Sequence, residues 1–137
     1  MKDITTKQWA YFLLRLTVGV NFFGHGLVRL PKIGGFRDWM VELFNGSLLP
    51  TSLVSAFATA LPVLEFSVGL LMILGWFTKQ ALSGAALLIC ALIWGSCLIE
   101  KWDMAGGQML YALILFVLLF YVEHNRLSID QWGRRTK

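Results

Sequence analysis

The residues of this chain that are most able to do chemistry lie in residues 15–31, an apolar stretch long enough to cross a bilayer. Asn21, His25 and Arg29 follow one another at intervals of four residues, so on an α-helix they form one polar stripe, and Arg15 lies beside it. Histidine can accept a proton or donate a hydrogen bond, and arginine stays charged while donating several hydrogen bonds. Because lipid does not tolerate such a stripe, we predict that it faces other parts of the protein.

Glu65 is the acidic residue expected at the same depth. With about 1.5 Å of rise per residue, it lies roughly 18 Å from the inner boundary, level with Asn21 and between Arg15 at roughly 10 Å and His25 at roughly 26 Å. An ionised carboxylate at this depth costs several kcal/mol unless it is paired, so we predict an ion pair with Arg15, which can donate two parallel hydrogen bonds. Two alternatives stay open: Arg15 reaches the inner headgroups, or Glu65 is a protonated or purely structural group.

Two residues on the last apolar segment extend the candidate site. Gln108 and Tyr111 lie three residues apart and share a helical face, and Ser96 falls at a similar depth on the preceding segment. We predict that Gln108 and Tyr111 complete a polar pocket with His25 and Glu65. Hydrogen bonds between helices, without a ligand, are the alternative for this pair.

The sequence does not contain the residue patterns that several classes of catalytic and metal sites require. We predict no metal site, because the second histidine, His124, falls at the inner end of the last span, far from His25. Cys90 and Cys97 lie seven residues apart on one segment, too far for a mutual disulfide, and there is no CxxC pair for thiol redox chemistry. Without a nucleophile and base or a phosphate-binding glycine loop, whether the chain is an enzyme stays open, and any chemistry needs a bound cofactor or substrate.

Four apolar segments must position these residues. They cover about residues 9–30, 53–77, 81–99 and 105–122, each near the roughly 20 residues that cross a bilayer. The 137 residues are 57% hydrophobic with a mean hydropathy of +0.66, well above a soluble protein. Short connections make sequential helices antiparallel, and four spans cannot close a β-barrel. We therefore predict an all-α fold: an integral membrane up-down-up-down four-helix bundle forming one transmembrane domain over residues 1–137.

A further short element is expected between the first two spans. Apolar residues at helical spacing alternate with Arg37, Asp38 and Glu42 over residues 36–44. This pattern predicts a short amphipathic helix that lies at the membrane interface or caps the mouth of the bundle. A purely structural helix and a gate over a ligand site are both compatible with it.

The distribution of basic residues predicts the orientation. Seven fall on the side of the termini and four on the other: Lys2, Lys7, Lys79, Arg126, Arg134, Arg135 and Lys137, against Arg29, Lys32, Arg37 and Lys101. The positive-inside rule then places both termini in the cytoplasm, with the first span an uncleaved membrane helix. The net charge of +4 thus reflects topology and the lipid bilayer, and we predict no nucleic-acid partner.

Two motifs carry a family resemblance: R-L-x-x-G-x-x-F-x-x-H-G from Arg15 to Gly26, and L-P-x-x-E-x-x-x-G-L-L-x-x-L-G from Leu61 to Gly75. With the short loops between spans, they make residues 10–125 resemble the DoxX/DoxD-like family of small four-span membrane proteins. The resemblance implies a multi-pass protein of the bacterial inner membrane. Members are described as subunits linked to quinone oxidoreduction, including thiosulfate:quinone oxidoreductase, or as anchors of redox-protective complexes.

Two main hypotheses for function follow. In the first, the chain is a membrane subunit of a quinone-linked oxidoreductase system and binds a quinone-like lipophilic molecule within the bundle. Its ligand-binding or proton-handling residues are then Arg15, Asn21, His25, Glu65, Gln108 and Tyr111. In the second, it is a non-catalytic anchor or assembly protein for a soluble or membrane redox partner, alone or as a homo-oligomer. A small transporter is a weaker third hypothesis, because four helices leave little room for a gated pore.

Overall fold

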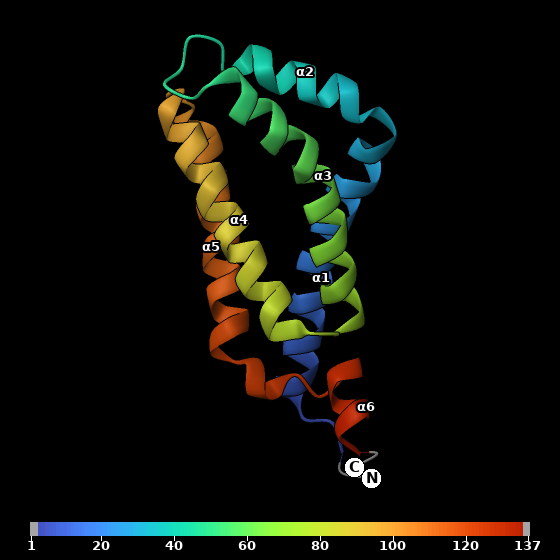
Figure 1. The fold of residues 1–137 in the computed structure, drawn as a ribbon. Coiled ribbons are helices and arrows are strands. Elements are labelled where there is room, and N and C mark those ends of the chain that lie inside the picture. Colours follow the sequence, from blue (N-terminus) through green and yellow to red (C-terminus); the bar gives the residue numbers. More distant parts are fainter. Residues whose placement is uncertain (1–2, 136–137) are drawn as a thin grey trace.

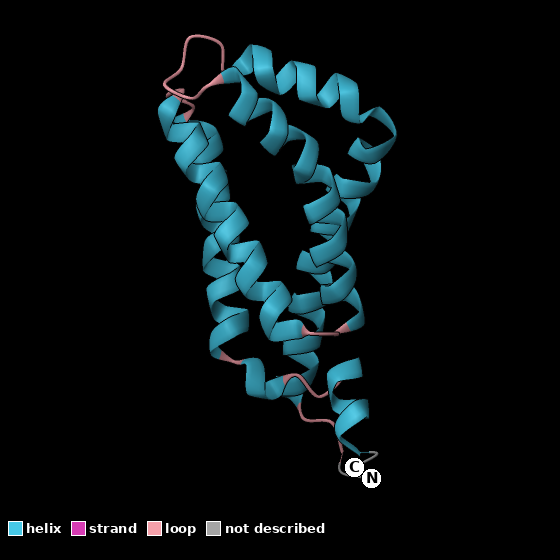
Figure 2. Cartoon of the chain, in the orientation of Figure 1, coloured by secondary structure: helices cyan, strands magenta, loops and turns pink. Residues whose placement is uncertain are grey.

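The structure, a computed structural model, describes residues 3–135, and within that range every regular element is a helix (Figure 2). Four long helices, α1 (Thr6–Arg29), α3 (Thr51–Leu74), α4 (Thr78–Leu98) and α5 (Trp102–Phe120), are long and apolar enough to cross a membrane. They run alternately up and down, so that α1 begins at the same end of the molecule at which α5 ends (Figure 1). The predicted all-α bundle with four membrane-spanning helices is confirmed, and the chain is a multi-pass membrane protein.

Each long helix begins two or three residues before the apolar segment that was predicted to cross the membrane. At α1 and α4, side chains outside the apolar runs satisfy backbone groups that the first turn leaves free. At α1, Thr5 Oγ1 accepts a hydrogen bond from the Gln8 backbone N–H at 3.4 Å, and Gln8 Oε1 accepts one from the Thr5 N–H at 3.1 Å. This capping box fixes the first turn of α1 ahead of its apolar part.

Glycines set the contact between α1 and α3, the most extensive in the bundle. A Cβ atom at Gly26 would lie 2.6 Å from Cα of Phe66, and one at Gly69 would lie 2.6 Å from Cα of Phe23. Only glycine permits these backbones to approach so closely. The two contacts also fix the antiparallel register, which brings Glu65 to the level of the C-terminal end of α1.

The four long helices form two pairs, α1 with α3 and α4 with α5, because contacts within these pairs outweigh those between them. Midway along its length α3 bends (Figure 1). Pro62 lies in this middle part of the helix, where it lacks an N–H donor and its ring crowds the carbonyl of the preceding turn. The N-terminal half of α3 therefore departs from the axis of its C-terminal half, and α2 packs along it.

The predicted amphipathic helix is α2 (Ile33–Leu43), which follows the single 3₁₀ turn η1 (Leu30–Lys32). Met40 is buried, whereas Arg37 and Asp38 are exposed and form an ion pair at 2.8 Å. Figure 1 shows α2 lying across one end of the bundle. Of the two predicted locations, this corresponds to a cap over the mouth of the bundle.

At the opposite end, the chain after α5 folds back through the 3₁₀ turn η2 (Val122–His124) and α6 (Ile129–Arg135), neither of which was predicted. The Asp130 carboxylate accepts hydrogen bonds from the backbone N–H groups of Phe77 at 2.8 Å and Thr78 at 2.9 Å. It thereby caps the N-terminus of α4, where an acidic group also interacts favourably with the helix dipole. The Asp130 N–H donates to the Gly75 carbonyl at 3.1 Å, so this segment holds the turn between α3 and α4.

The basic residues behind the predicted orientation divide between the two ends as their helices do. Lys7, Lys79 and Arg126 lie at the end where α1 and α4 begin, and Lys101 lies at the end that α2 covers. Lys2 and Lys137, together with the side chains of Arg134 and Arg135, lie outside what the structure describes. The cytoplasmic location of the termini therefore stays a prediction.

Candidate functional site

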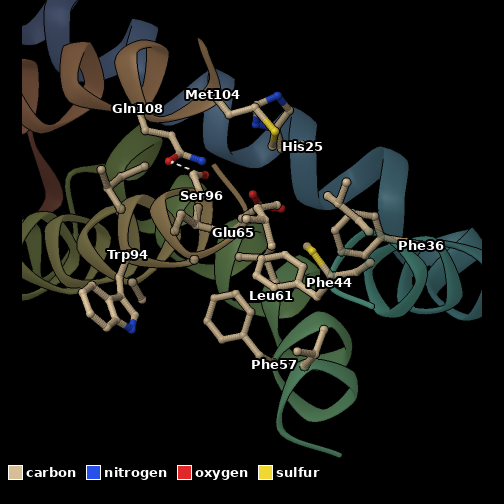
Figure 3. A pocket seen from close by; sticks show the side chains of 18 of the residues that line it. His25, Phe36, Phe44, Phe57, Leu61, Glu65, Trp94, Ser96, Met104 and Gln108 are labelled. Atoms are coloured by element: carbon tan, nitrogen blue, oxygen red, sulfur yellow. Dashed lines mark hydrogen bonds between the residues drawn. The ribbon is translucent and has the colours of Figure 1, made fainter. Parts of the chain in front are cut away.

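A cavity of about 390 Å³ lies between the two helix pairs, beneath α2. Its volume is in the range of sites for small organic ligands. In Figure 3 the Glu65 carboxylate lies near the centre of the view, with His25 on one side and the Ser96–Gln108 pair on another. Five of the six predicted site residues line this cavity, namely Asn21, His25, Glu65, Gln108 and Tyr111.

Glu65 is paired with Arg29. Both carboxylate oxygens accept hydrogen bonds from Nη1 of Arg29 at 2.7 Å. The Glu65 side chain is 4% exposed and that of Arg29 is 29% exposed. The carboxylate is therefore buried, whereas the guanidinium is partly accessible, and both residues line the cavity. The guanidinium carbon also lies 4.6 Å from the ring centre of Phe36 on α2, a cation–π distance. This one arginine thus connects α1, α2 and α3.

The predicted pairing of Glu65 with Arg15 is wrong. Arg15, only 1% exposed, points to the C-terminal segment, where Nη1 donates to Oδ1 of Asn125 and Nη2 donates to the Leu127 carbonyl at 2.8 Å. Fourteen residues separate Arg15 from Arg29, about 21 Å along a helix. The prediction placed the start of the first span and the end of the second, at Phe77, on one level, whereas the glycine contacts between α1 and α3 place Glu65 near Arg29. The alternative that Arg15 reaches lipid headgroups is also wrong, since it is buried.

The cavity holds more hydrogen-bond donors than its own acceptors use. Ser96 Oγ donates to Oε1 of Gln108 at 3.1 Å, which leaves the Gln108 amide nitrogen able to donate elsewhere. Within residues 3–135, the side chains of Asn21, His25 and Tyr111 make no hydrogen bond. The one carboxylate of the site is already paired with Arg29. Arg29 and the Gln108 amide nitrogen can only donate, whereas Asn21, His25 and Tyr111 can donate or accept. A ligand with oxygen acceptors can therefore be bound at this site, and the aromatic walls suit a flat apolar body.

Among the described residues, metal-binding side chains do not gather at the cavity. Over the part of the chain that the structure describes, no three His, Cys, Asp or Glu side chains converge as metal ligands would. Cys90 and Cys97 are both unpaired on α4.

Comparison with known proteins identifies one family. The family model described as Methylamine utilisation protein MauE matches residues 7–108, well over half of the chain. The chain belongs to the MauE family. No curated protein and no solved structure matches it.

The MauE match supports the expected small membrane protein family, but it does not support the DoxX/DoxD-like family in particular. The matched range includes α1 to α4 and the first residues of α5. It therefore contains the Arg29–Glu65 pair and the Ser96–Gln108 pair, and it ends before Tyr111 and before the C-terminal segment that binds Arg15.

Three features of this MauE protein differ from, or are absent from, what its sequence predicts. Arg29 belongs to the predicted polar stripe, but Arg15 was predicted as the partner of Glu65. The spacing of four residues between His25 and Arg29 places Arg29 on the same helix face as the other site residues. The contribution of α2 to the cavity wall, through Phe36 in particular, had no local signal beyond amphipathicity. Asn125 and Asp130 lie in a short polar stretch after the last span. Its sequence has no pattern that indicates contacts with the helices.

Proposed function

We propose that this MauE-family protein binds a quinone-like molecule in its cavity and serves a membrane redox system as an accessory subunit. The observation that carries the proposal is the cavity beneath α2, where a paired carboxylate is surrounded by unused donors and aromatic walls. A quinone has two carbonyl oxygens on a flat apolar ring, so it needs donors at its edge and apolar surfaces on its faces.

The individual roles follow from the geometry of the site. Arg29 is held by Glu65 through Nη1 alone, so its other nitrogens can donate to a ligand oxygen. His25 and the amide of Gln108 face the same cavity (Figure 3). We assign His25 and Gln108 to the carbonyl oxygens of the ligand, and Glu65 to the orientation of Arg29.

The redox setting rests on the family. The MauE description refers to methylamine utilisation, and use of methylamine as a nutrient requires its oxidation. A role beside a redox enzyme is in keeping with both the description and a quinone-like ligand. Together with the predicted orientation, this leads us to propose the bacterial inner membrane as the location, with both termini in the cytoplasm and a redox protein as partner.

Quinone titration of the purified protein in lipid nanodiscs, read by tryptophan quenching, tests the ligand. Loss of a ligand hydrogen bond in His25→Ala should weaken binding by up to about tenfold, and Glu65→Gln should weaken it because Arg29 then keeps one of its two hydrogen bonds to residue 65 and loses the charge that holds it. Leu27→Ala is the matched control, since Leu27 is exposed on the same helix and does not line the cavity. Unchanged affinity in both site variants rules out this site.

The alternative is an anchor without a ligand, favoured by the MauE family description alone. Co-purification from gently solubilised membranes separates the two. A redox partner that is retained equally by wild type, His25→Ala and Glu65→Gln, from a protein that binds no quinone, supports the anchor.

A further inference from the structure

The lining of the cavity is polarised across the bundle. Its polar side chains come mainly from α1 and α5, with Asn21 and His25 on one helix and Gln108 and Tyr111 on the other. The opposite side, between the N-terminal half of α3 and α4, is apolar. That side is formed by Leu53, Phe57, Ala91 and Trp94, and we call it the apolar window.

The apolar window reaches the surface of the protein. Leu53 is 55% exposed and Trp94 is 63% exposed, although both also line the cavity. Ala91, one turn before Trp94 on α4 and also exposed, has the smallest side chain of the four. Because these residues lie in two membrane-spanning helices, the surface that they reach faces lipid. The cavity is therefore open towards the bilayer on its apolar side, near the end of the bundle that α2 covers.

Two features shape the apolar window, which is not the cavity's only exposed side, since His25 and Met104 on the polar side are exposed as well. The bend of α3 near Pro62 separates its N-terminal half from the axis of the helix pair (Figure 1). Above the window, Phe44 packs against α4 at Gly95, where an added Cβ would lie 3.1 Å from the phenyl ring. Phe44 thus covers the cavity next to Gly95, and the apolar window opens beside this contact.

We propose that the ligand is a long-chain amphiphile bound in one orientation, with its acceptor-bearing head at Arg29, His25 and Gln108 and its hydrocarbon chain leaving through the apolar window into the bilayer. This inference rests on the proposed function and adds the chemical class of the ligand and the direction in which its chain leaves the cavity. A hydrocarbon chain is solvated equally well by lipid and by the protein interior, so the chain adds little to the affinity. It sets the orientation of the ligand in the cavity and the route by which the ligand enters, while the head contributes most of the affinity.

The test compares two probes, a dimethoxybenzoquinone without a chain and the same head carrying a decyl chain. Ala91→Phe places a ring in the window and leaves the polar side untouched. The ring obstructs the path of the chain, so affinity for the decyl quinone should fall about tenfold or more, while the affinity for the chain-free quinone should change less than about twofold. Ala91→Leu, a smaller obstruction, should give the same selectivity with a smaller effect.

Leu87→Phe is the matched control, because Leu87 lies one turn earlier on α4, is 73% exposed and does not line the cavity. It should leave the affinity for both quinones unchanged. If Ala91→Phe weakens both quinones equally, or neither, the apolar window is not the path of the chain, while the proposed ligand site stands. If the wild-type protein binds neither quinone, the proposed function itself fails and this inference falls with it.

Discussion

The ion pair between Arg29 and Glu65 offers the most direct test of the register between α1 and α3. Removing one member of a buried ion pair costs about 3–5 kcal/mol. Here the Arg29 side chain is 29% exposed, so water screens part of the interaction, and we expect about 1–3 kcal/mol for Arg29→Met. Glu65→Gln should cost less, because the amide oxygen still accepts a hydrogen bond from Arg29.

A double-mutant cycle isolates the pair. Because Arg29→Met leaves a buried carboxylate without its cation, adding Glu65→Gln should recover part of the lost stability, with a coupling of about 1–2 kcal/mol. The free energy of unfolding is measured by denaturant titration in mixed micelles. The control cycle combines Glu65→Gln with Arg15→Met, and since Arg15 lies about 21 Å from Arg29 along α1, its effects should add within about 0.5 kcal/mol. Additivity in the Arg29 cycle, or coupling in the Arg15 cycle, would refute the register.

Two further predictions concern the scaffold. Gly26→Val should destabilise the protein by at least about 1–3 kcal/mol, because the side chain would collide with the backbone of α3. Gly24→Ala is the control: nothing lies within 4 Å of the added Cβ, so this variant should be neutral or slightly stabilising. Melting temperatures in detergent measure both effects, and equal losses of stability would contradict the close approach of α1 and α3. Asp130→Ala should cost about 1 kcal/mol through loss of the cap on α4, with faster hydrogen exchange at the backbone amides of Phe77 and Thr78. Unchanged exchange there would show that Asp130 is not the cap.

The four spans and the polar stripe could be predicted because both signals are local. Hydropathy over some 20 residues marks a membrane helix whatever its neighbours, and Asn21, His25 and Arg29 share a face by helical periodicity alone. The level at which one helix meets another is not local. It depends on which glycines meet which backbones, here Gly26 against Phe66, and without that contact the distances from the membrane boundary led to Arg15 as the partner of Glu65.

The C-terminal segment shows a second limit of the same kind. Arg15 is buried among neutral acceptors, Asn125 and the Leu127 carbonyl, and the Asn125 amide in turn donates to Thr78 Oγ1 at 2.9 Å. These partners lie some 50 to 110 residues apart along the chain. A polar stretch after the last span has no periodicity that would reveal such contacts, so a buried cation on α1 had no visible partner other than an acidic residue.

Two costly features of this bundle converge on the cavity. A proline within a helix destabilises it by about 3 kcal/mol, and a buried ion pair is seldom more stabilising than apolar side chains of the same size. Pro62 and Glu65 lie within one turn of each other on α3, and the first is placed where the helix departs from its axis while the second holds Arg29 at the cavity. A bundle selected for stability alone would have a straight α3 and an apolar residue at position 65. Both costs are accounted for together if the bend makes room for a ligand and the ion pair positions the donors that bind it.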